Sequence, residues 1–389
     1  MKTIILGPPG TGKTTTLLDL VDQFIQQGIR PKQIGYFSFT RKAAREAATR
    51  AAEKFGLDAE KDLENFRTLH SYAFSRLAMS KEKMMTPENY REFGKLVGIP
   101  IKTGKHSEDD GTFNSDNEYL TIMNTARVKR MDLLEYYDSR QNILDIERDT
   151  LYLLSEELKR YKKEKGLKDF TDLLEDYIAQ ETKQSFEALF IDEAQDLSLI
   201  QWDMVRSMWA NANKTYIAGD DDQAIYKWAG ADVKRFLDIQ GNVQILPVSY
   251  RLPRTIHKLA CDISHKISLR QDKEWTSRDD QGSITDINSI EDVDMSDGEW
   301  LILARSGYQL FKAEAYCKRM GWFYEKGYHE FRTNKFVIAI RSWIKLNVSS
   351  QTSMQNSSSI FRTLAGAEPL LRDDRESYEV LPPSHVGAS

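Results

Sequence analysis

A glycine-rich loop follows an apolar stretch at the start of the chain. Residues 7–14 read Gly-Pro-Pro-Gly-Thr-Gly-Lys-Thr and come directly after Ile4-Ile5-Leu6. They fit the pattern G-x-x-x-x-G-K-[ST], in which backbone N–H groups and the N-terminus of the next helix bind phosphate oxygens. The sequence therefore predicts a buried strand at 3–6, a phosphate-binding loop at 7–12 and a helix from Lys13, the opening of a parallel α/β domain.

Paired carboxylates end a second apolar run, where Asp192-Glu193 follows Ala-Leu-Phe-Ile. With a phosphate loop present, we expect Asp192 to hold Mg²⁺ and Glu193 to position the attacking water. Lys13 should reach the β- and γ-phosphates, and Thr14 should be the second magnesium ligand. The chain thus has the pattern of a nucleoside triphosphate hydrolase, whose expected nucleotide contacts are Gly7, Pro8, Pro9, Gly10, Thr11, Gly12, Lys13, Thr14 and Thr15.

Size and composition are those of an ordinary globular protein. The chain has 389 residues, of which 40% are hydrophobic and 29% charged, and this length predicts two or three domains. The net charge of −5 gives no global indication of nucleic-acid binding, although a local basic groove would be enough. No apolar stretch approaches the ~20 residues of a membrane span. We expect neither a signal peptide nor a membrane partner, and a cytoplasmic location.

Periodicity divides the chain into segments. A second strand is expected at 35–40, with a helix at 43–54, and the pattern between about 78 and 180 becomes helical and polar. Sheet character returns at 188–192, 215–219 and 243–246, and a further strand is expected at 300–304. We therefore predict an α/β domain at 1–77 plus 181–253, a helical insertion at 78–180, a partial second α/β domain at 254–346, and a serine-rich disordered or aberrant tail at 347–389.

One block points to what the hydrolysis drives. Residues 216–232, Tyr-Ile-Ala-Gly-Asp-Asp-Asp-Gln-Ala-Ile-Tyr-Lys-Trp-Ala-Gly-Ala-Asp, resemble the third motif of the UvrD/Rep helicases of superfamily 1. The resemblance implies that Gln223 senses the γ-phosphate and that Trp228 stacks on a base of single-stranded DNA, with Tyr226 beside it. It also implies a RecA-like P-loop NTPase motor domain with a helical insertion, followed by a partial second RecA-like domain.

Other stretches resemble the same family in the same order. Residues 37–44 and 66–71 resemble its DNA-contact motifs, which implies contacts through Phe39, Thr40 and His70, and residues 169–174 resemble a helix start. At 249–251 the resemblance implies that Tyr250 stacks on adenine and that Arg251 reaches the γ-phosphate. Residues 303–306 and 324–327 resemble the start of the second motor domain. For Phe39 and His70 taken singly, burial in the sheet or a satisfied surface role is an equal alternative.

The DNA interpretation is physically reasonable. Aromatic side chains stack on bases without reading sequence, at about 1–3 kcal/mol per base. Basic side chains lie near these stretches in the sequence and can meet phosphates: Arg41, Lys42, Arg67 and Lys227. A basic run at 159–168 could contact duplex DNA or form a solvated helical face.

Two departures from the family pattern matter. Only six residues precede Gly7, so the usual upstream glutamine segment that reads adenine is not found. The resemblance ends near Leu346, and neither of the two later motifs follows, including the arginine finger, which is typically worth about 10³–10⁵ in rate. The sequence suggests a truncated gene product, or a partner chain that supplies the second half.

The resulting prediction is an ATP-dependent DNA helicase or translocase of UvrD type. It would use ATP and Mg²⁺, act on single-stranded DNA and duplex junctions, and couple hydrolysis to 3′–5′ movement and unwinding. The alternative is a truncated, nucleotide-gated single-stranded DNA-binding protein with little ATPase activity. A small-molecule P-loop kinase, or another ATPase, would not need the block around Trp228.

Overall fold

The computed structural model describes residues 2–101, 117–140, 146–322 and 324–325. The chain divides into two compact units, Met1–Ile284 and Thr285–Ser389. The predicted tail at 347–389, and the part of the second domain after residue 325, lie outside the described residues. Among the helices that are described, none combines the length and apolar character needed to cross a membrane.

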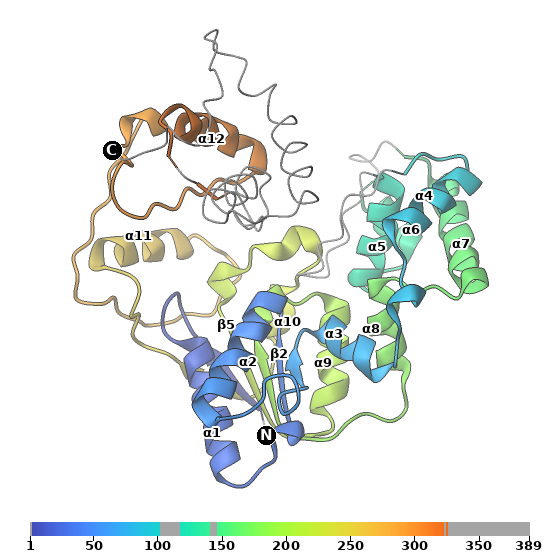
Figure 1. Ribbon diagram of the computed structural model, residues 1–389, viewed down its shortest axis with the longest axis horizontal. Helices are drawn as coiled ribbons and strands as arrows, with labels where there is room; N and C mark the ends of the chain where they lie inside the picture. Colours follow the sequence, from blue (N-terminus) through green and yellow to red (C-terminus); the bar gives the residue numbers. More distant parts are fainter. Residues whose placement is uncertain (1, 102–116, 141–145, 323, 326–389) are drawn as a thin grey trace, which may run out of the picture. The chain divides into compact units, whose positions relative to one another are not determined.

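A six-stranded sheet forms the centre of the first unit (Figure 1), and all of its paired strands run parallel. In the sheet the order is β3-β2-β4-β5-β1-β6. This confirms the predicted parallel α/β architecture. The strands are β1 (Lys2–Leu6), β2 (Ile34–Ser38), β3 (Phe66–Arg67), β4 (Phe186–Asp192), β5 (Ala212–Gly219) and β6 (Asn242–Ile245).

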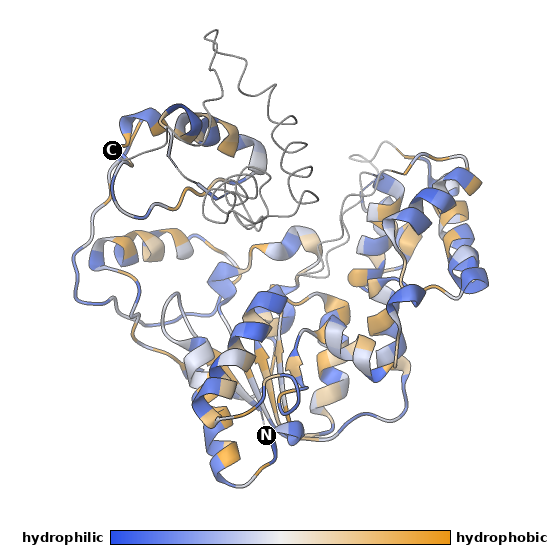
Figure 2. Ribbon diagram, in the orientation of Figure 1, coloured by the Kyte–Doolittle hydropathy of each residue, from blue (hydrophilic) through white to orange (hydrophobic). Residues whose placement is uncertain are grey.

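Helices cover both faces of this sheet, which explains its continuous apolar strands. On β4, Leu189 and Ile191 belong to one core and Phe190 to the other. The strands are accordingly hydrophobic along most of their length in Figure 2. One face packs against α1 (Lys13–Gln26) and α2 (Arg41–Phe55); the other packs against α3 (Leu69–Arg76), α8 (Phe170–Ala179), α9 (Leu199–Trp209) and α10 (Val233–Leu237).

The segment between α3 and α8 is helical in its described part. It carries α4 (Pro87–Leu96), α5 (Glu118–Val128), α6 (Leu133–Asp138) and α7 (Arg148–Lys165) around a core of its own. Helix α8 lies inside the range expected for the insertion, yet it packs against one face of the sheet. The reason is that Leu173, Leu174 and Tyr177 are buried in the sheet core.

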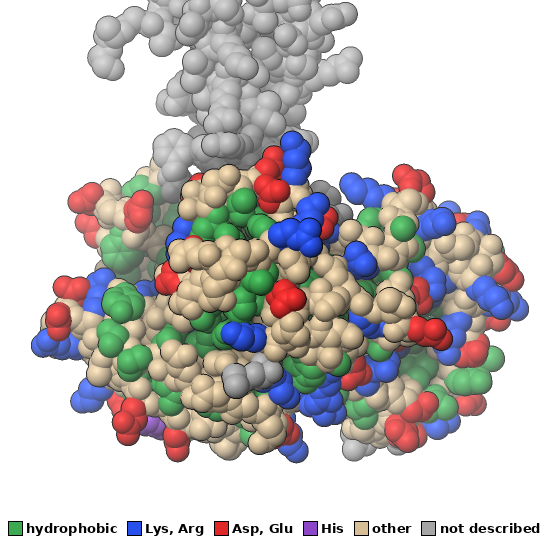
Figure 3. Space-filling model, turned by 90° about the horizontal axis from the view of Figure 1, so that it is seen from below, with side chains coloured by type: hydrophobic (Ala, Val, Ile, Leu, Met, Phe, Trp, Pro, Cys, Tyr) green, Lys and Arg blue, Asp and Glu red, His purple; other side chains and the backbone are tan. Residues whose placement is uncertain are grey.

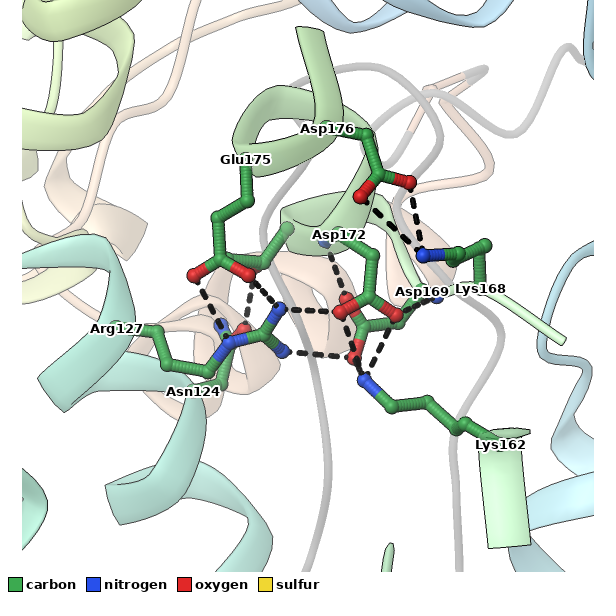
Figure 4. Close-up of polar contacts among 9 residues, drawn as sticks. Asn124, Arg127, Lys162, Lys168, Asp169, Asp172, Glu175 and Asp176 are labelled. Carbon is green, nitrogen blue, oxygen red and sulfur yellow. Dashed lines mark hydrogen bonds and ion pairs between the residues drawn. The ribbon is translucent and has the colours of Figure 1, made fainter. Parts of the chain in front are cut away.

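A buried ion-pair network joins these helices to α8 (Figure 4). Arg127 of α5 and Lys162 of α7 both contact the Asp169 carboxylate, at 2.8 Å and 2.7 Å. Burial alone would raise the pKa of Asp169, but the two cations outweigh it and hold that pKa well below its usual range. Asp169 also caps α8 by accepting a hydrogen bond from the Asp172 N–H. The helix start predicted at 169–174 is therefore confirmed.

The remaining described helices are α11 (Arg254–Ser264) in the first unit and α12 (Leu310–Arg319) in the second. Short 3₁₀ turns are η1 (Pro31–Gln33), η2 (Lys81–Lys83), η3 (Ala194–Asp196), η4 (Asp221–Gln223), η5 (Tyr226–Ala229), η6 (Ile290–Asp292) and η7 (Gly307–Gln309).

The strand expected at 300–304 is wrong, because these residues have no strand conformation. Leu301 and Leu303 are each 81% exposed. A strand needs a neighbouring strand to pair its backbone groups, and the described residues after Ile284 contain none.

Candidate functional site

The phosphate loop has the backbone that its glycines require. Gly10 and Gly12 have φ angles of 73° and 83°, which other residues rarely adopt. Within the loop, the Thr11 hydroxyl donates to the Pro8 carbonyl at 2.8 Å. A Cβ atom on Gly7 would lie 2.1 Å from Cγ of Lys13, so the lysine side chain crosses the start of the loop. Lys13 Nζ donates to the Gly7 carbonyl at 2.8 Å.

A buried carboxylate faces the start of α1. Thr14 Oγ1 donates to Oδ2 of Asp192 at 2.8 Å, and the Tyr36 hydroxyl donates to the same oxygen at 2.8 Å. Burial raises the pKa of Asp192, and the nearby Glu193 raises it further, while the hydrogen bonds from Tyr36 and Thr14 act in the opposite direction. A hydroxyl and a carboxylate in contact are the oxygen ligands that Mg²⁺ prefers, so these residues fit a magnesium site.

Glu193 begins a short polar chain toward the loop after β5. Its backbone has a φ angle of 53°, unusual for a residue other than glycine and common where function stores strain. Glu193 Oε2 accepts a hydrogen bond from Gln195 Nε2 at 3.0 Å, and Gln195 Oε1 accepts one from the Asp220 N–H at 3.0 Å. The ends of β4 and β5 are thereby connected through one amide side chain.

The loop after β5 carries both Gln223 and Trp228. Gln223 Nε2 donates to Asp220 Oδ2 at 2.6 Å, which ties it to the buried end of β5. Five residues later the Trp228 side chain is 68% exposed. Its ring centroid lies 6.2 Å from that of Tyr226, which in turn lies 5.1 Å from the ring of Phe39. One loop therefore holds the Gln223 amide against the Asp220 carboxylate and presents the aromatic ring of Trp228 to solvent.

The segment 249–251 lies against the phosphate loop. Ser249 Oγ donates to the Pro9 carbonyl at 2.7 Å, and the Tyr250 N–H donates to the Gly10 carbonyl at 2.9 Å. A Cβ atom on Gly10 would lie 2.2 Å from Cβ of Arg251, so the arginine backbone passes directly over the loop. The Tyr250 ring is 75% exposed. Residues 240 positions apart in sequence thus meet at one site, as the motif resemblance implied.

Two of the other expected DNA contacts, Phe39 and His70, line an open groove of about 1280 Å³ between α2, α3 and the start of α4. Phe39 is only 6% exposed, so the alternative of packing in the sheet fits it best. The Thr40 hydroxyl accepts a hydrogen bond from the Ala43 N–H and caps α2. His70 is half-buried in the groove wall. Basic side chains along this groove are Arg41, Arg45, Arg67 and Lys81.

The basic run on α7 and the segment after it is largely neutralised by its neighbours. Lys159 pairs with Glu156 at 2.7 Å, Arg160 pairs with Glu157, and Lys165 pairs with Glu92 at 2.8 Å. On the face shown in Figure 3, basic and acidic side chains are likewise interspersed. The solvated helical face is the better interpretation of this run.

Four polar residues near the site were given no role from the sequence: Tyr36, Gln195, Asp220 and Lys273. Gln195 and Asp220 lie inside stretches that were noticed for other residues. Tyr36 places a hydroxyl within a strand that is otherwise buried and apolar, which was a usable signal. Lys273 had no local signal, since its partners lie about fifty residues earlier.

Comparison with known proteins agrees with this geometry. The family model described as UvrD/REP helicase N-terminal domain matches residues 1–244. The chain is 26% identical over 243 residues to a probable DNA helicase II homolog of Mycoplasma pneumoniae, a match covering 59% of this chain and 34% of that protein. It is 24% identical to the ATP-dependent DNA helicase Rep of Buchnera aphidicola, a match that covers 87% of this chain and 52% of that protein.

It is also 25% identical to the ATP-dependent DNA helicase PcrA of Leuconostoc citreum, with 72% of this chain and 40% of that protein covered. The chain therefore spans between about a third and about a half of the length of these relatives. The matched residues 1–244 contain the phosphate loop, the Asp192-Glu193 pair and the Gln223–Trp228 loop. Since the family model covers more than half of the chain, this protein belongs to the UvrD/REP helicase family.

Proposed function

We propose that the chain is the ATP-binding part of a DNA helicase or translocase that couples ATP hydrolysis to movement on single-stranded DNA. The observation that carries the proposal is the loop after β5. Its Gln223 is hydrogen-bonded to Asp220 at the buried end of β5, and its Trp228 is exposed only five residues away. The names of the relatives, which include ATP-dependent DNA helicases, support the same reading.

ATP and Mg²⁺ fit the residues present. The phosphate loop and Lys13 would bind the β- and γ-phosphates, and the Thr14 hydroxyl and the Asp192 carboxylate would hold the metal. The ion would supply charge neutralisation for the departing phosphates. Glu193 would orient the attacking water and accept its proton, Gln223 and Arg251 would contact the γ-phosphate, and Tyr250 would stack on the base.

Single-stranded DNA would follow the groove lined by α2 and α3 and stack on Trp228. The basic groove side chains would contact its phosphates. The proposal also includes 3′–5′ polarity of movement, duplex junctions as substrates, a partner chain that supplies further motifs, and a cytoplasmic location. The kinase alternative is disfavoured by the family membership. The nucleotide-gated binding protein without turnover remains the second candidate, and the same assay distinguishes it.

The test is ATP hydrolysis by the 389-residue chain with and without single-stranded DNA. Turnover stimulated by DNA would support the motor; nucleotide-dependent DNA binding with negligible turnover would support the second candidate. Lys13→Ala is expected to abolish turnover, whereas Lys95→Ala on the exposed face of α4 should not. Normal turnover by Lys13→Ala would refute the assignment of the site.

Trp228 is tested separately by DNA affinity. Trp228→Ala is expected to weaken single-strand binding about tenfold or more and to leave nucleotide binding unchanged, because one base loses its stacking partner. Trp300→Ala is the matched control, since Trp300 is also exposed but lies in the second unit. Equal DNA affinity of Trp228→Ala and the control would contradict the stacking role.

A further inference from the structure

A lysine with a fully buried side chain lies among three consecutive aspartates at the end of β5. Lys273 Nζ contacts Asp220 Oδ1 at 3.0 Å and Asp222 Oδ2 at 3.0 Å, and it also pairs with Asp221. The side chains of Lys273, Asp220 and Asp221 are 0% exposed. A second cation, Arg270, makes two hydrogen bonds to the Asp222 carboxylate, at 2.9 Å and 3.0 Å.

These contacts matter because the aspartates begin the loop that carries Gln223. The Asp220 carboxylate has three partners: Oδ1 contacts Lys273 Nζ and accepts a hydrogen bond from the Asp222 N–H at 3.3 Å, and Oδ2 accepts the hydrogen bond from Gln223 Nε2. The Asp220 N–H is bonded to Gln195, whose amide donates to Glu193. A continuous polar path therefore runs from Lys273 through Asp220 to both Gln223 and Glu193.

Burial makes this arrangement sensitive to the lysine. Three carboxylates in an apolar, dry environment repel one another strongly unless cations compensate them. Burial would lower the pKa of Lys273, but Asp220 and its neighbours outweigh that effect and raise it, so the lysine is charged. Without the lysine, Asp220 Oδ1 would keep only the 3.3 Å hydrogen bond from the Asp222 N–H, and the carboxylate would be held less firmly.

The segment that carries Lys273 is also fixed at the phosphate loop. Between Pro247 and Thr276 the chain leaves the sheet, passes over the loop at Ser249 and Tyr250, forms α11 and returns. The Thr276 N–H donates to the Pro247 carbonyl at 2.8 Å, which closes this excursion. One segment thus holds the nucleotide loop at its start and the aspartate loop near its end.

We propose that Lys273 is a positioning residue, which fixes Asp220 and thereby aims the Gln223 amide at the γ-phosphate. This inference rests on the proposed function, because it assumes that Gln223 senses that phosphate. It assigns Lys273 no contact with nucleotide. Loss of the lysine should therefore remove discrimination between nucleotides with and without a γ-phosphate while sparing the binding of the diphosphate.

The experiment compares the affinity of the full chain for Mg·ADP and for the non-hydrolysable analogue Mg·AMP-PNP. The main variant is Lys273→Met combined with Asp221→Asn, which removes the lysine yet leaves the net charge of the buried cluster unchanged. Gln223→Ala is the reference for a lost sensor. Lys266→Met, an exposed lysine in the same segment, is the matched control. Thermal unfolding checks that each variant is folded.

The double variant is expected to bind ADP within about twofold of wild type and to lose about tenfold of the preference for AMP-PNP, as Gln223→Ala does. Adding Gln223→Ala to it should cause little further loss, because both changes act on one contact. The positioning role would be overturned if the double variant bound ADP and AMP-PNP with equally reduced affinity, or if its preference for AMP-PNP over ADP were unchanged. An unfolded double variant would overturn it too. A wild type that shows no preference would overturn the proposed function itself, and this inference with it.

Discussion

Asp196 allows a quantitative test of the electrostatics around the site. It is 8% exposed, and its Oδ1 atom has no hydrogen-bond partner, although Oδ2 accepts one from Gln195 Nε2. Burial, followed by the neighbouring Glu193 charge, raises the pKa of Asp196 from 3.8 to about 7. Each pKa unit corresponds to about 1.4 kcal/mol, so ionising this group in the folded protein costs up to about 4 kcal/mol.

The sign of the pH effect follows directly. Because the folded-state pKa lies above the unfolded one, the unfolded chain binds fewer protons between these two values. The favourable contribution of Asp196 to the free energy of unfolding is therefore fully present below about pH 4 and is lost as the pH rises through about 7. Asp196→Asn cannot ionise, so its stability relative to wild type should increase across this window, by about 1.4 kcal/mol per pH unit at most, and then level off.

The assay is urea unfolding of both proteins at pH values from 5 to 8.5. Other titrating groups cancel in the difference between them. A constant offset is expected as well, because the amide of the variant brings a donor to a buried position where Asp196 Oδ1 has no hydrogen-bond partner. Asp238→Asn, at an exposed carboxylate, is the control and should give a flat difference. A flat difference for Asp196→Asn would refute the argument that Asp196 is buried at an electrostatic cost.

Three further predictions concern stability and binding. Arg127→Leu should lower the free energy of unfolding by about 3 kcal/mol, since its carboxylate partners on α8 stay buried, whereas Arg160→Ala on the surface of α7 should cost less than about 1 kcal/mol. Equal losses in urea titrations would contradict this. Tyr36→Phe should lower the free energy of unfolding by about 1–2 kcal/mol through the lost hydrogen bond to the Asp192 carboxylate; an unchanged melting temperature would count against that bond. Gly10→Ala should prevent the binding of ADP, because the new Cβ would lie 2.2 Å from Cβ of Arg251 and the backbone φ at this position is 73°. A fluorescence titration measures this binding, and wild-type affinity would show that the loop tolerates the change.

Local patterns in the sequence were sufficient for the parts of the site that lie at strand ends. The stretches ending at Leu6, Asp192 and Gly219 are buried strands followed by polar or glycine-rich residues. Strand β5 lies between β4 and β1 in the sheet, so the loops after these three strands emerge side by side. The residue types predicted the phosphate loop and the carboxylates, whereas the adjacency of the three strands came from the family resemblance.

The failures have a common physical origin. At 300–304 the continuous apolar run Trp-Leu-Ile-Leu-Ala was typical of a strand, but a strand forms only where a partner strand is present. The helical, polar pattern at 78–180 also did not show that α8 packs against the sheet, which the apolar face of this helix determines. Lys273 contributes through tertiary contacts alone. In each case the missing information was a neighbour distant in sequence.

The two ends of the loop after β5 bear on the proposed coupling between nucleotide and DNA binding. At its start, Asp220 is held by Lys273 and Gln195. At its end, Ala231 forms a bridge with Ser198, and the Asp232 N–H donates to the Leu197 carbonyl at 3.0 Å. Since both ends are hydrogen-bonded to residues 195–198, moving the whole loop in response to a change at Gln223 would break these contacts. We therefore expect residues 224–229, which include Trp228, to take up such a change, and under the proposed function this short span would couple hydrolysis to DNA.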